Sequence, residues 1–435
     1  MPKLFPYQEP HVASLELALE KYNAALDASD LGTGKTICAC EVARRRGTEL
    51  VTVCKKVMIP TWRFWMDQFG VSGVVGNWEL ARKRGLPDRR GSLYVFDEVH
   101  EGAGYKTLNG RLLVNTFEAK HPLLMLSATA IESPLKMWAL GYILGFHNLK
   151  DYLRWMLRNG VKRNFGYGGY HFNGSQAVLA NINKRIFPER GSRMRKSEIP
   201  DFPECQFIVE LVDSCFDGAL DKWFHQITIR ELENQQRREV NLDLDEDQEE
   251  PWKLQPSESI LPEILYARMR AELSKVPAIL ELIKEGTANG YRTVVFVNFL
   301  STMQAIQELA GLENEHLIWG GQKTDQRLSA ITAFQANQVK VLCATIDSGG
   351  ASIDLHDIHG NHPRMSIVCP TWRAVSLRQA LGRVHRAGAK SKSIQKLVFL
   401  GEGIEVRVAE RVREKLFAID TINDADLAQE EFIYE

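Results

Sequence analysis

The chain has 435 residues, of which 44% are hydrophobic, and its formal net charge at pH 7 is −1. This length exceeds one ordinary domain, since domains commonly hold roughly 100–200 residues, so two or three domains are expected. A nearly neutral chain excludes binding to a polyanion through overall charge and requires local basic patches for such a partner. The seven cysteines form no C-x-x-C pair, which argues against zinc binding and a disulfide framework.

The N-terminal sequence MPKLFPYQEPHV has neither an apolar signal core nor the composition of a transit peptide. No apolar run in the chain approaches the ~18 residues of a membrane span. These features predict a soluble, cytoplasmic protein with no membrane partner and no zinc.

Residues 1–145 alternate short apolar runs with helical patterns. The runs AALDAS, LVTVC, LYVFDE and LLMLSAT are typical of buried parallel strands, and each ends in polar residues. This alternation predicts a doubly wound α/β lobe.

The stretch ASDLGTGKT follows the first of these strands and precedes the helical pattern TICACEVARRR. Gly32 and Gly34 allow backbone N–H groups to face a phosphate, Lys35 can bind the β- and γ-phosphates, and Thr36 offers a hydroxyl to Mg²⁺. Ser29 stands where the strict pattern G-x-x-x-x-G-K-[ST] has its first glycine. The alternative to a nucleotide site is a polar turn that happens to read GTGKT.

Asp97 and Glu98, in LYVFDEVH, end a later predicted strand. One carboxylate can hold Mg²⁺ while its neighbour orients or deprotonates the attacking water. Two adjacent acids could also be a simple strand-end cap, but their combination with GKT favours an ATP site. The stretch LSATA, with Ser127 and Thr129, closes the next strand and is weak by itself, because these are ordinary turn residues.

Residues 146–262 lose the strand-turn-helix rhythm and predict a mainly helical, basic linker or insertion. From Arg154 to Lys196 this segment holds ten basic residues and one acidic residue, Glu189. The run DLDEDQEE at 243–250 predicts a solvated acidic loop.

The basic segment also contains NFGYGGYHFNG, in which aromatic residues alternate with glycines. Positive charge can neutralise phosphates, and rings can stack on exposed bases or wedge a fork. The alternative is a glycine-rich loop whose rings pack on the nearby YLRWML helix and whose arginines are merely solvated. The candidate nucleic-acid contacts of this segment are Arg158, Lys162, Arg163, Tyr167 and Tyr170.

Residues 263–435 repeat the α/β style of the first lobe. The runs RTVVFVNF, VKVLCATI, MSIVCP and IQKLVFL predict strands. Helical patterns between them cover 301–310, 324–337 and 376–387.

The stretch QALGRVHRAG places Gln379, Arg383 and Arg386 at positions i, i+4 and i+7. On a helix they would share one face, from which two guanidiniums could reach a γ-phosphate. A solvated arginine-rich helix face is the alternative.

The elements D-x-G-x-G-K-T, DEVH and SAT resemble, in order and spacing, motifs I, II and III of superfamily-two helicases. Asp30 fits the Swi/Snf branch, in which the residues before the loop are usually acidic rather than glycine. The resemblance implies two RecA-like lobes and a nucleotide site. Gln8 ends the element LFPYQ, which resembles the family's L-x-P-Y-Q element, and the resemblance implies that it contacts the adenine edge. The other implied nucleotide-binding residues are Asp30, Gly32, Thr33, Gly34, Lys35 and Thr36.

The second lobe extends the resemblance. QALGRVHRAG is similar to motif VI, Q-x-x-G-R-x-x-R, which implies catalytic roles for Gln379, Arg383 and Arg386. ATIDSGGASIDL resembles motif V, and Asp354 stands where the Swi/Snf branch usually has asparagine. RMRKSEIPDFP resembles the arginine-rich segment that joins the Swi/Snf lobes. The nucleic-acid contacts implied by motif V are Ser348, Gly349 and Gly350.

We therefore expect an ATP- and Mg²⁺-dependent DNA translocase or helicase that can act as a monomer on duplex, forked or branched DNA. Lys35, Asp97 and Glu98 are expected to be catalytic, with Thr36 and Asp97 on the metal. The branch to which the resemblance points suggests fork or junction remodelling in DNA repair or recombination. An RNA helicase of the DExH type and an ATP-binding scaffold without turnover are the alternatives.

Overall fold

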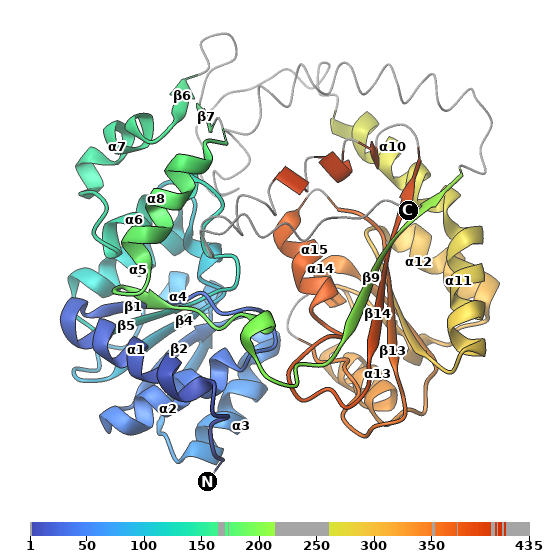
Figure 1. Cartoon of the computed structure of the whole chain (residues 1–435), viewed down its shortest axis with the longest axis horizontal. Helices are drawn as coiled ribbons and strands as arrows, with labels where there is room; N and C mark the ends of the chain where they lie inside the picture. Colours follow the sequence, from blue (N-terminus) through green and yellow to red (C-terminus); the bar gives the residue numbers. More distant parts are fainter. Residues whose placement is uncertain are drawn as a thin grey trace. The chain divides into compact units, whose positions relative to one another are not determined.

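The computed structural model describes residues 2–163, 170–172, 174–213, 261–349, 353–371, 373–401, 405–406, 408–410 and 413–414. The described chain forms two compact units that divide after Pro200 (Figure 1). Each unit contains a parallel six-stranded sheet with helices on both faces. The predicted architecture of two doubly wound α/β lobes is confirmed, whereas the boundaries proposed at 145 and 262 stay predictions. The acidic run at 243–250 lies outside the described residues.

The sheet of unit 1 has the strand order β3-β2-β4-β5-β1-β8, and all its neighbours are parallel. Its strands are β1 (Ala24–Asp27), β2 (Leu50–Cys54), β3 (Gly73–Asn77), β4 (Leu93–Asp97), β5 (Leu123–Leu126) and β8 (Gly191–Ser192). The helices of unit 1 are α1 (Gln8–Tyr22), α2 (Lys35–Arg46), α3 (Ile59–Phe69), α4 (Trp78–Arg84), α5 (Leu108–Glu118), α6 (Trp138–Ile143), α7 (Tyr152–Arg158) and α8 (Gln176–Ile186). A short antiparallel hairpin pairs β6 (Val161–Arg163) with β7 (Tyr170–Phe172).

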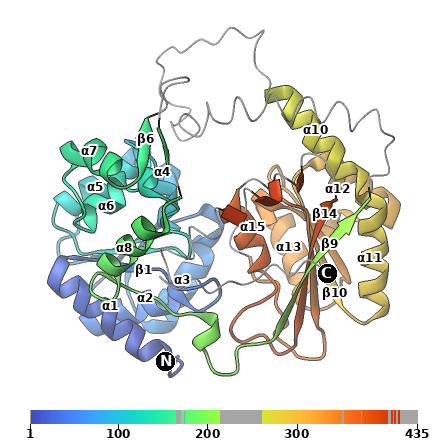
Figure 2. The same cartoon turned by 45° about the horizontal axis from the view of Figure 1, so that its top comes forward.

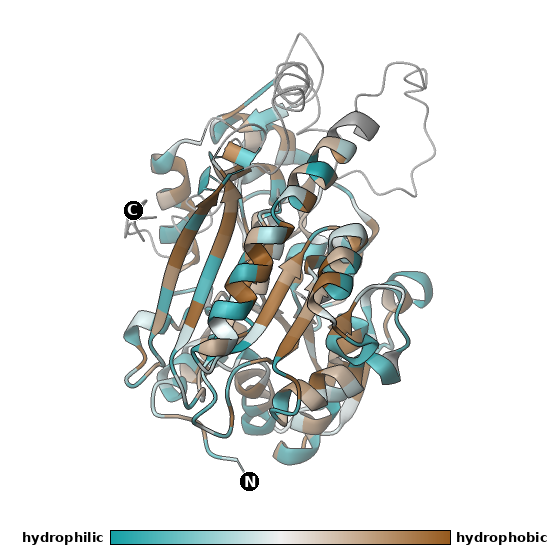
Figure 3. Cartoon of the chain, turned by 90° about the vertical axis from the view of Figure 1, so that its right-hand side faces the viewer, coloured by the Kyte–Doolittle hydropathy of each residue, from teal (hydrophilic) through white to brown (hydrophobic). Residues whose placement is uncertain are grey.

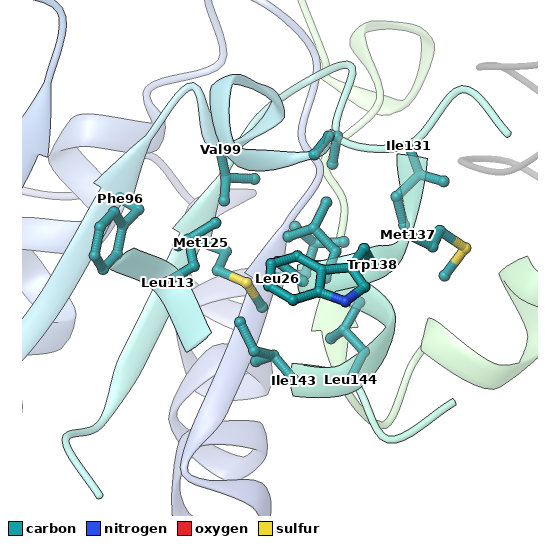
Figure 4. Close-up of a cluster of buried hydrophobic side chains, with 14 of the residues drawn as sticks. Leu26, Phe96, Val99, Leu113, Met125, Ile131, Met137, Trp138, Ile143 and Leu144 are labelled. Atoms are coloured by element: carbon teal, nitrogen blue, oxygen red, sulfur yellow. The ribbon is translucent and has the colours of Figure 1, made fainter. Parts of the chain in front are cut away.

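Successive strand residues of unit 1 enter two separate cores, because side chains alternate between the faces of a sheet. Leu26 and Phe96 belong to one core, which also contains Leu113 of α5 and Trp138 of α6 (Figure 4). Ala25 and Val95, their chain neighbours, pack instead against α1, α2 and α3. Burial on both faces explains why these strands read as continuous apolar runs.

The sheet of unit 2 has the order β11-β12-β10-β13-β14-β9 and is also parallel throughout. Its strands are β9 (Cys205–Val212), β10 (Arg292–Val297), β11 (Leu317–Ile318), β12 (Val341–Thr345), β13 (Arg364–Val368) and β14 (Ser393–Leu400). Its helices are α10 (Leu261–Ser274), α11 (Val276–Ala288), α12 (Leu300–Ala310), α13 (Thr324–Gln335), α14 (Ile346–Gly349) and α15 (Ala374–Leu381).

Helices cover both faces of the unit 2 sheet (Figure 2). One core joins the sheet to α11 and α12, and the other joins it to α13 and α15. The strands between them are largely hydrophobic (Figure 3). Among the described residues, no helix is both long enough and apolar enough to cross a bilayer.

The structure corrects the sequence-based elements in two places. The segment 146–262, predicted to be mainly helical, holds α7 and α8 but also contributes a strand to each sheet, because β8 joins the sheet of unit 1 and β9 joins that of unit 2. β9 is a partly exposed edge strand, so it lacks the continuous apolar run of a central strand. The helix predicted over 376–387 ends at Leu381.

Candidate functional site

The phosphate-binding loop connects β1 to the N-terminus of α2, as predicted. Gly32 and Gly34 have φ angles of 80° and 95°, a region that favours glycine. A Cβ atom on Gly34 would also collide with the side-chain amide of Gln8. Lys35 is the first residue of α2, so the N–H groups at this helix end face the position of a bound phosphate.

The Lys35 ammonium lies on the loop itself. Its Nζ donates to the carbonyl oxygens of Ser29 at 2.8 Å and Asp30 at 3.0 Å. Burial lowers the pKa of Lys35, against the opposing effect of nearby carboxylates that include Asp27 and Glu98. Phosphate oxygens can replace the two carbonyls as acceptors, so the geometry suits a triphosphate.

Gln8 lies against this loop and is buried. Its Nε2 donates to the carbonyl of Thr33 at 3.0 Å, and its Oε1 accepts from the N–H of Phe5 at 3.0 Å. An amide has two donor hydrogens and two acceptor sites, so these bonds leave one of each. That pair matches the donor and acceptor on the edge of adenine.

Asp97 is the last residue of β4, at the carboxyl edge of the sheet, and Glu98 follows it. Trp62 donates from Nε1 to Asp97 Oδ2 at 3.0 Å, and Trp78 donates to the Asp97 carbonyl at 3.1 Å. Burial and the neighbouring Glu98 carboxylate raise the pKa of Asp97 to about 6. The raised pKa means that the ionised form of Asp97 is disfavoured in the protein alone. A bound cation would stabilise that form, so the carboxylate fits a divalent metal.

A histidine joins the second and third motifs. His100 Nδ1 lies 3.3 Å from Glu98 Oε2 and 3.0 Å from Ser127 Oγ. The Ser127 hydroxyl in turn accepts from the N–H of Thr129 at 3.1 Å. The orientation of Glu98 is thereby linked to the end of β5.

A second buried network beneath the loop escaped sequence reasoning. His11 Nε2 lies 3.1 Å from Asp27 Oδ2, and its Nδ1 lies 2.8 Å from the hydroxyl of Ser192. Asp27 Oδ1 also accepts from the N–H of Ser29 at 2.9 Å. The only local signal for this network was the acid at the end of β1, because its partners come from distant segments.

The motif VI residues of unit 2 do not share one helix face, which corrects the prediction. Gln379 is buried within α15, but Arg383 and Arg386 follow its last residue. Arg383 is buried and donates to the carbonyl of Ile353 at 3.3 Å, whereas Arg386 lies 2.5 Å from Asp354. Gly382 follows the helix and breaks its periodicity. The catalytic roles of the three residues stay predictions.

The motif V residues follow β12. Ser348 is buried in the short helix α14, and its carbonyl accepts from the guanidinium of Arg327. Gly349 ends α14, and Gly350 lies outside the described residues. Their contact with nucleic acid remains a prediction.

The basic residues predicted to hold phosphates lie on α7 and β6. We call Arg158, Lys162 and Arg163 the α7–β6 basic triad; all three side chains are exposed. Tyr170 is partly buried and packs against the hydrophobic core of unit 1, which supports the packing alternative for this ring. Tyr167 lies outside the described residues.

Comparison with known proteins defines the class of this chain. The helicase conserved C-terminal domain family matches residues 274–388, within unit 2. The chain is 29% identical to the putative ATP-dependent RNA helicase L364 of Acanthamoeba polyphaga mimivirus over 476 aligned residues, covering 98% of this chain and 84% of that protein. The chain is an ATP-hydrolysing helicase.

The predicted resemblance to superfamily-two helicases is thus confirmed. The Sulfolobus solfataricus SWI2/SNF2 ATPase core in complex with dsDNA is similar at 16% identity with a TM-score of 0.39, over 98% of this chain and 94% of that one. The two-lobe fold itself is established by the strand orders of the two sheets.

Proposed function

We propose that this chain is a translocase that uses ATP hydrolysis to move along duplex or branched DNA. The observation that carries the ATP part is the joint arrangement of the phosphate-binding loop and the two acids in unit 1. The loop offers N–H groups, the Lys35 ammonium and the Thr36 hydroxyl, while the carboxyl edge of β4 offers Asp97 and Glu98.

Each of these groups has a distinct task. Thr36 and Asp97 would hold Mg²⁺, which supplies charge neutralisation at the β- and γ-phosphates. Lys35 would exchange its two loop carbonyls for phosphate oxygens. Glu98 would accept the proton of the attacking water, with its carboxylate oriented by His100 at 3.3 Å.

The choice of DNA rests on the motifs that resemble the Swi/Snf branch, above all the acidic residue Asp30 ahead of the two glycines of the loop. Motors of that branch mostly slide on duplex without complete strand separation, so fork or junction remodelling is proposed. The α7–β6 basic triad supplies exposed positive charge on unit 1 for phosphate contacts.

RNA is the second candidate substrate. It is favoured by one observation, the name of the mimivirus protein that is similar over nearly this whole chain. In this alternative the ATP site and its residues keep the same tasks, and only the activating nucleic acid differs.

An ATPase panel tests the proposal. The rate is measured without nucleic acid and with single-stranded, duplex, forked and four-way DNA, and with matched RNA. Stronger stimulation by duplex or branched DNA than by RNA is expected. Preferential stimulation by RNA would replace DNA with the second candidate. The Lys35→Ala variant gives the background rate of the assay. A wild-type rate no higher than this background with every substrate would refute the proposed motor function.

A further inference from the structure

The loop carries an acidic residue at a place where negative charge disfavours its ligand. Asp30 lies within the loop, and its carboxylate is among the charges that act on Lys35. A nucleoside triphosphate is a polyanion, so an uncompensated carboxylate in its cradle would weaken binding. The structure shows what compensates it.

A strap formed by residues 190–196 runs along β1 and the loop. The backbone N–H groups of Leu26, Ala28 and Asp30 donate to carbonyls of Arg190, Ser192 and Met194, each at 3.0 Å. These bonds extend the pairing of β8 beyond its two residues.

The strap also binds the loop through side chains. The N–H of Met194 donates to the hydroxyl of Ser29 at 3.0 Å. A glycine at position 29 could not accept this bond, so the departure from the strict phosphate-loop pattern has a physical reason. Serine has less backbone freedom than glycine, but its hydroxyl ties the loop to a segment that is distant in the sequence.

Arg193 makes the charged contact of the strap. One guanidinium nitrogen donates to the carbonyl of Ala28 at 2.9 Å, and another donates to Asp30 Oδ1 at 3.1 Å. The other carboxylate oxygen of Asp30 accepts from the N–H of Lys196 at 3.0 Å. The Arg193 side chain is only 6% exposed and that of Asp30 14%, so solvent screens this pair weakly.

We propose that Arg193 is a positioning residue of the nucleotide site, which neutralises Asp30 and fixes the loop that holds Lys35. The proposal deepens the ATP-binding function and rests on it. Lys35 donates to the carbonyls of Ser29 and Asp30, and the strap holds these same two residues. Arg193 therefore acts on ATP through the loop and need not touch the nucleotide.

The test compares Arg193→Met with Arg195→Met in the full chain. Arg195 is a strap neighbour whose guanidinium lies 3.4 Å from Glu198, so it is the matched control. The readouts are kcat and KM for ATP, and calorimetric binding of a non-hydrolysable ATP analogue with Mg²⁺. We expect Arg193→Met to raise KM and the analogue Kd about tenfold, as for a lost hydrogen bond between charged groups, with a smaller change in kcat.

A double variant distinguishes a positioning role of Arg193 from a merely structural one. Removing the acid as well, in Arg193→Met with Asp30→Asn, should recover most of the lost affinity. A structural anchor alone would lower the melting temperature and would not be restored by this second change. If Arg193→Met fails to fold, Arg193→Gln, which keeps donor groups without the charge, replaces it in the same comparison.

Two outcomes would overturn the inference. One is an unchanged KM and Kd in the Arg193 variant relative to Arg195→Met, and the other is a double variant no better than the single. Failure of the proposed function looks different, because then the wild-type protein itself would neither bind the analogue nor hydrolyse ATP.

Discussion

Replacing Asp97 with asparagine should stabilise the nucleotide-free protein while abolishing its activity. Burial and Glu98 raise the pKa of Asp97 from 3.8 to about 6, so the folded state holds its charged form at a cost. At about 1.4 kcal/mol per pKa unit, this shift means that ionised Asp97 lowers the free energy of unfolding by roughly 3 kcal/mol above pH 6. An asparagine oxygen can still accept the bond from Trp62, so the neutral side chain should remove the cost without removing the contact.

The direction of the pH dependence of stability follows from the raised pKa of Asp97. The folded pKa is raised, so wild type loses stability as the pH rises from the unfolded pKa toward 6, and the cost is constant above it. The gain from Asp97→Asn should therefore be full at pH 7.5 and about half as large at pH 5. Urea unfolding of unit 1, followed at both pH values without Mg²⁺ or nucleotide, measures it. The control is Asp67→Asn, at an exposed position of α3.

Two results would refute this reasoning. A loss of stability in Asp97→Asn at pH 7.5 would mean that the carboxylate charge is compensated within the protein. A gain equal at both pH values would mean that it arises from packing rather than from ionisation.

Further variants test the other predicted roles. Lys35→Ala and Glu98→Gln should both abolish turnover, but only Glu98→Gln should still bind ATP in calorimetry, because its phosphate loop is intact; near-wild-type turnover in either contradicts the assignment. Arg386→Ala should lower kcat on the order of 10³-fold with little change in ATP affinity, and loss of binding at an unchanged rate per bound nucleotide would exclude that role. Gln8→Ala should weaken ATP affinity and relax discrimination against other nucleotides, measured as kcat/KM ratios; unchanged ratios would count against adenine recognition. Alanine at all three positions of the α7–β6 basic triad should reduce the log–log salt slope of DNA binding by about two to three units, and an unchanged slope in a folded variant would favour merely solvated side chains.

Local patterns in the sequence were enough to predict the two lobes and the candidate ATP site. Central strands such as β1 and β4 are buried on both faces, so their apolar runs are visible without tertiary information. The glycines at 32 and 34 lie in the loop after β1, Asp97 is the last residue of β4 and Glu98 follows it. Because the carboxyl ends of parallel strands meet at one sheet edge, the fold brings the ends of β1 and β4, and the motif residues that these strands carry, to the same edge.

Tertiary structure decided the features that depend on distant or half-exposed segments. The edge strand β9 lacks a buried periodicity, and the helix with Gln379 stops before Arg383, although the helical pattern over 376–387 suggested that it continues. The contact between Arg193 and Asp30 joins residues 163 positions apart. No pattern within either segment encodes that contact, because it exists only once the strap adds β8 to the sheet beside β1.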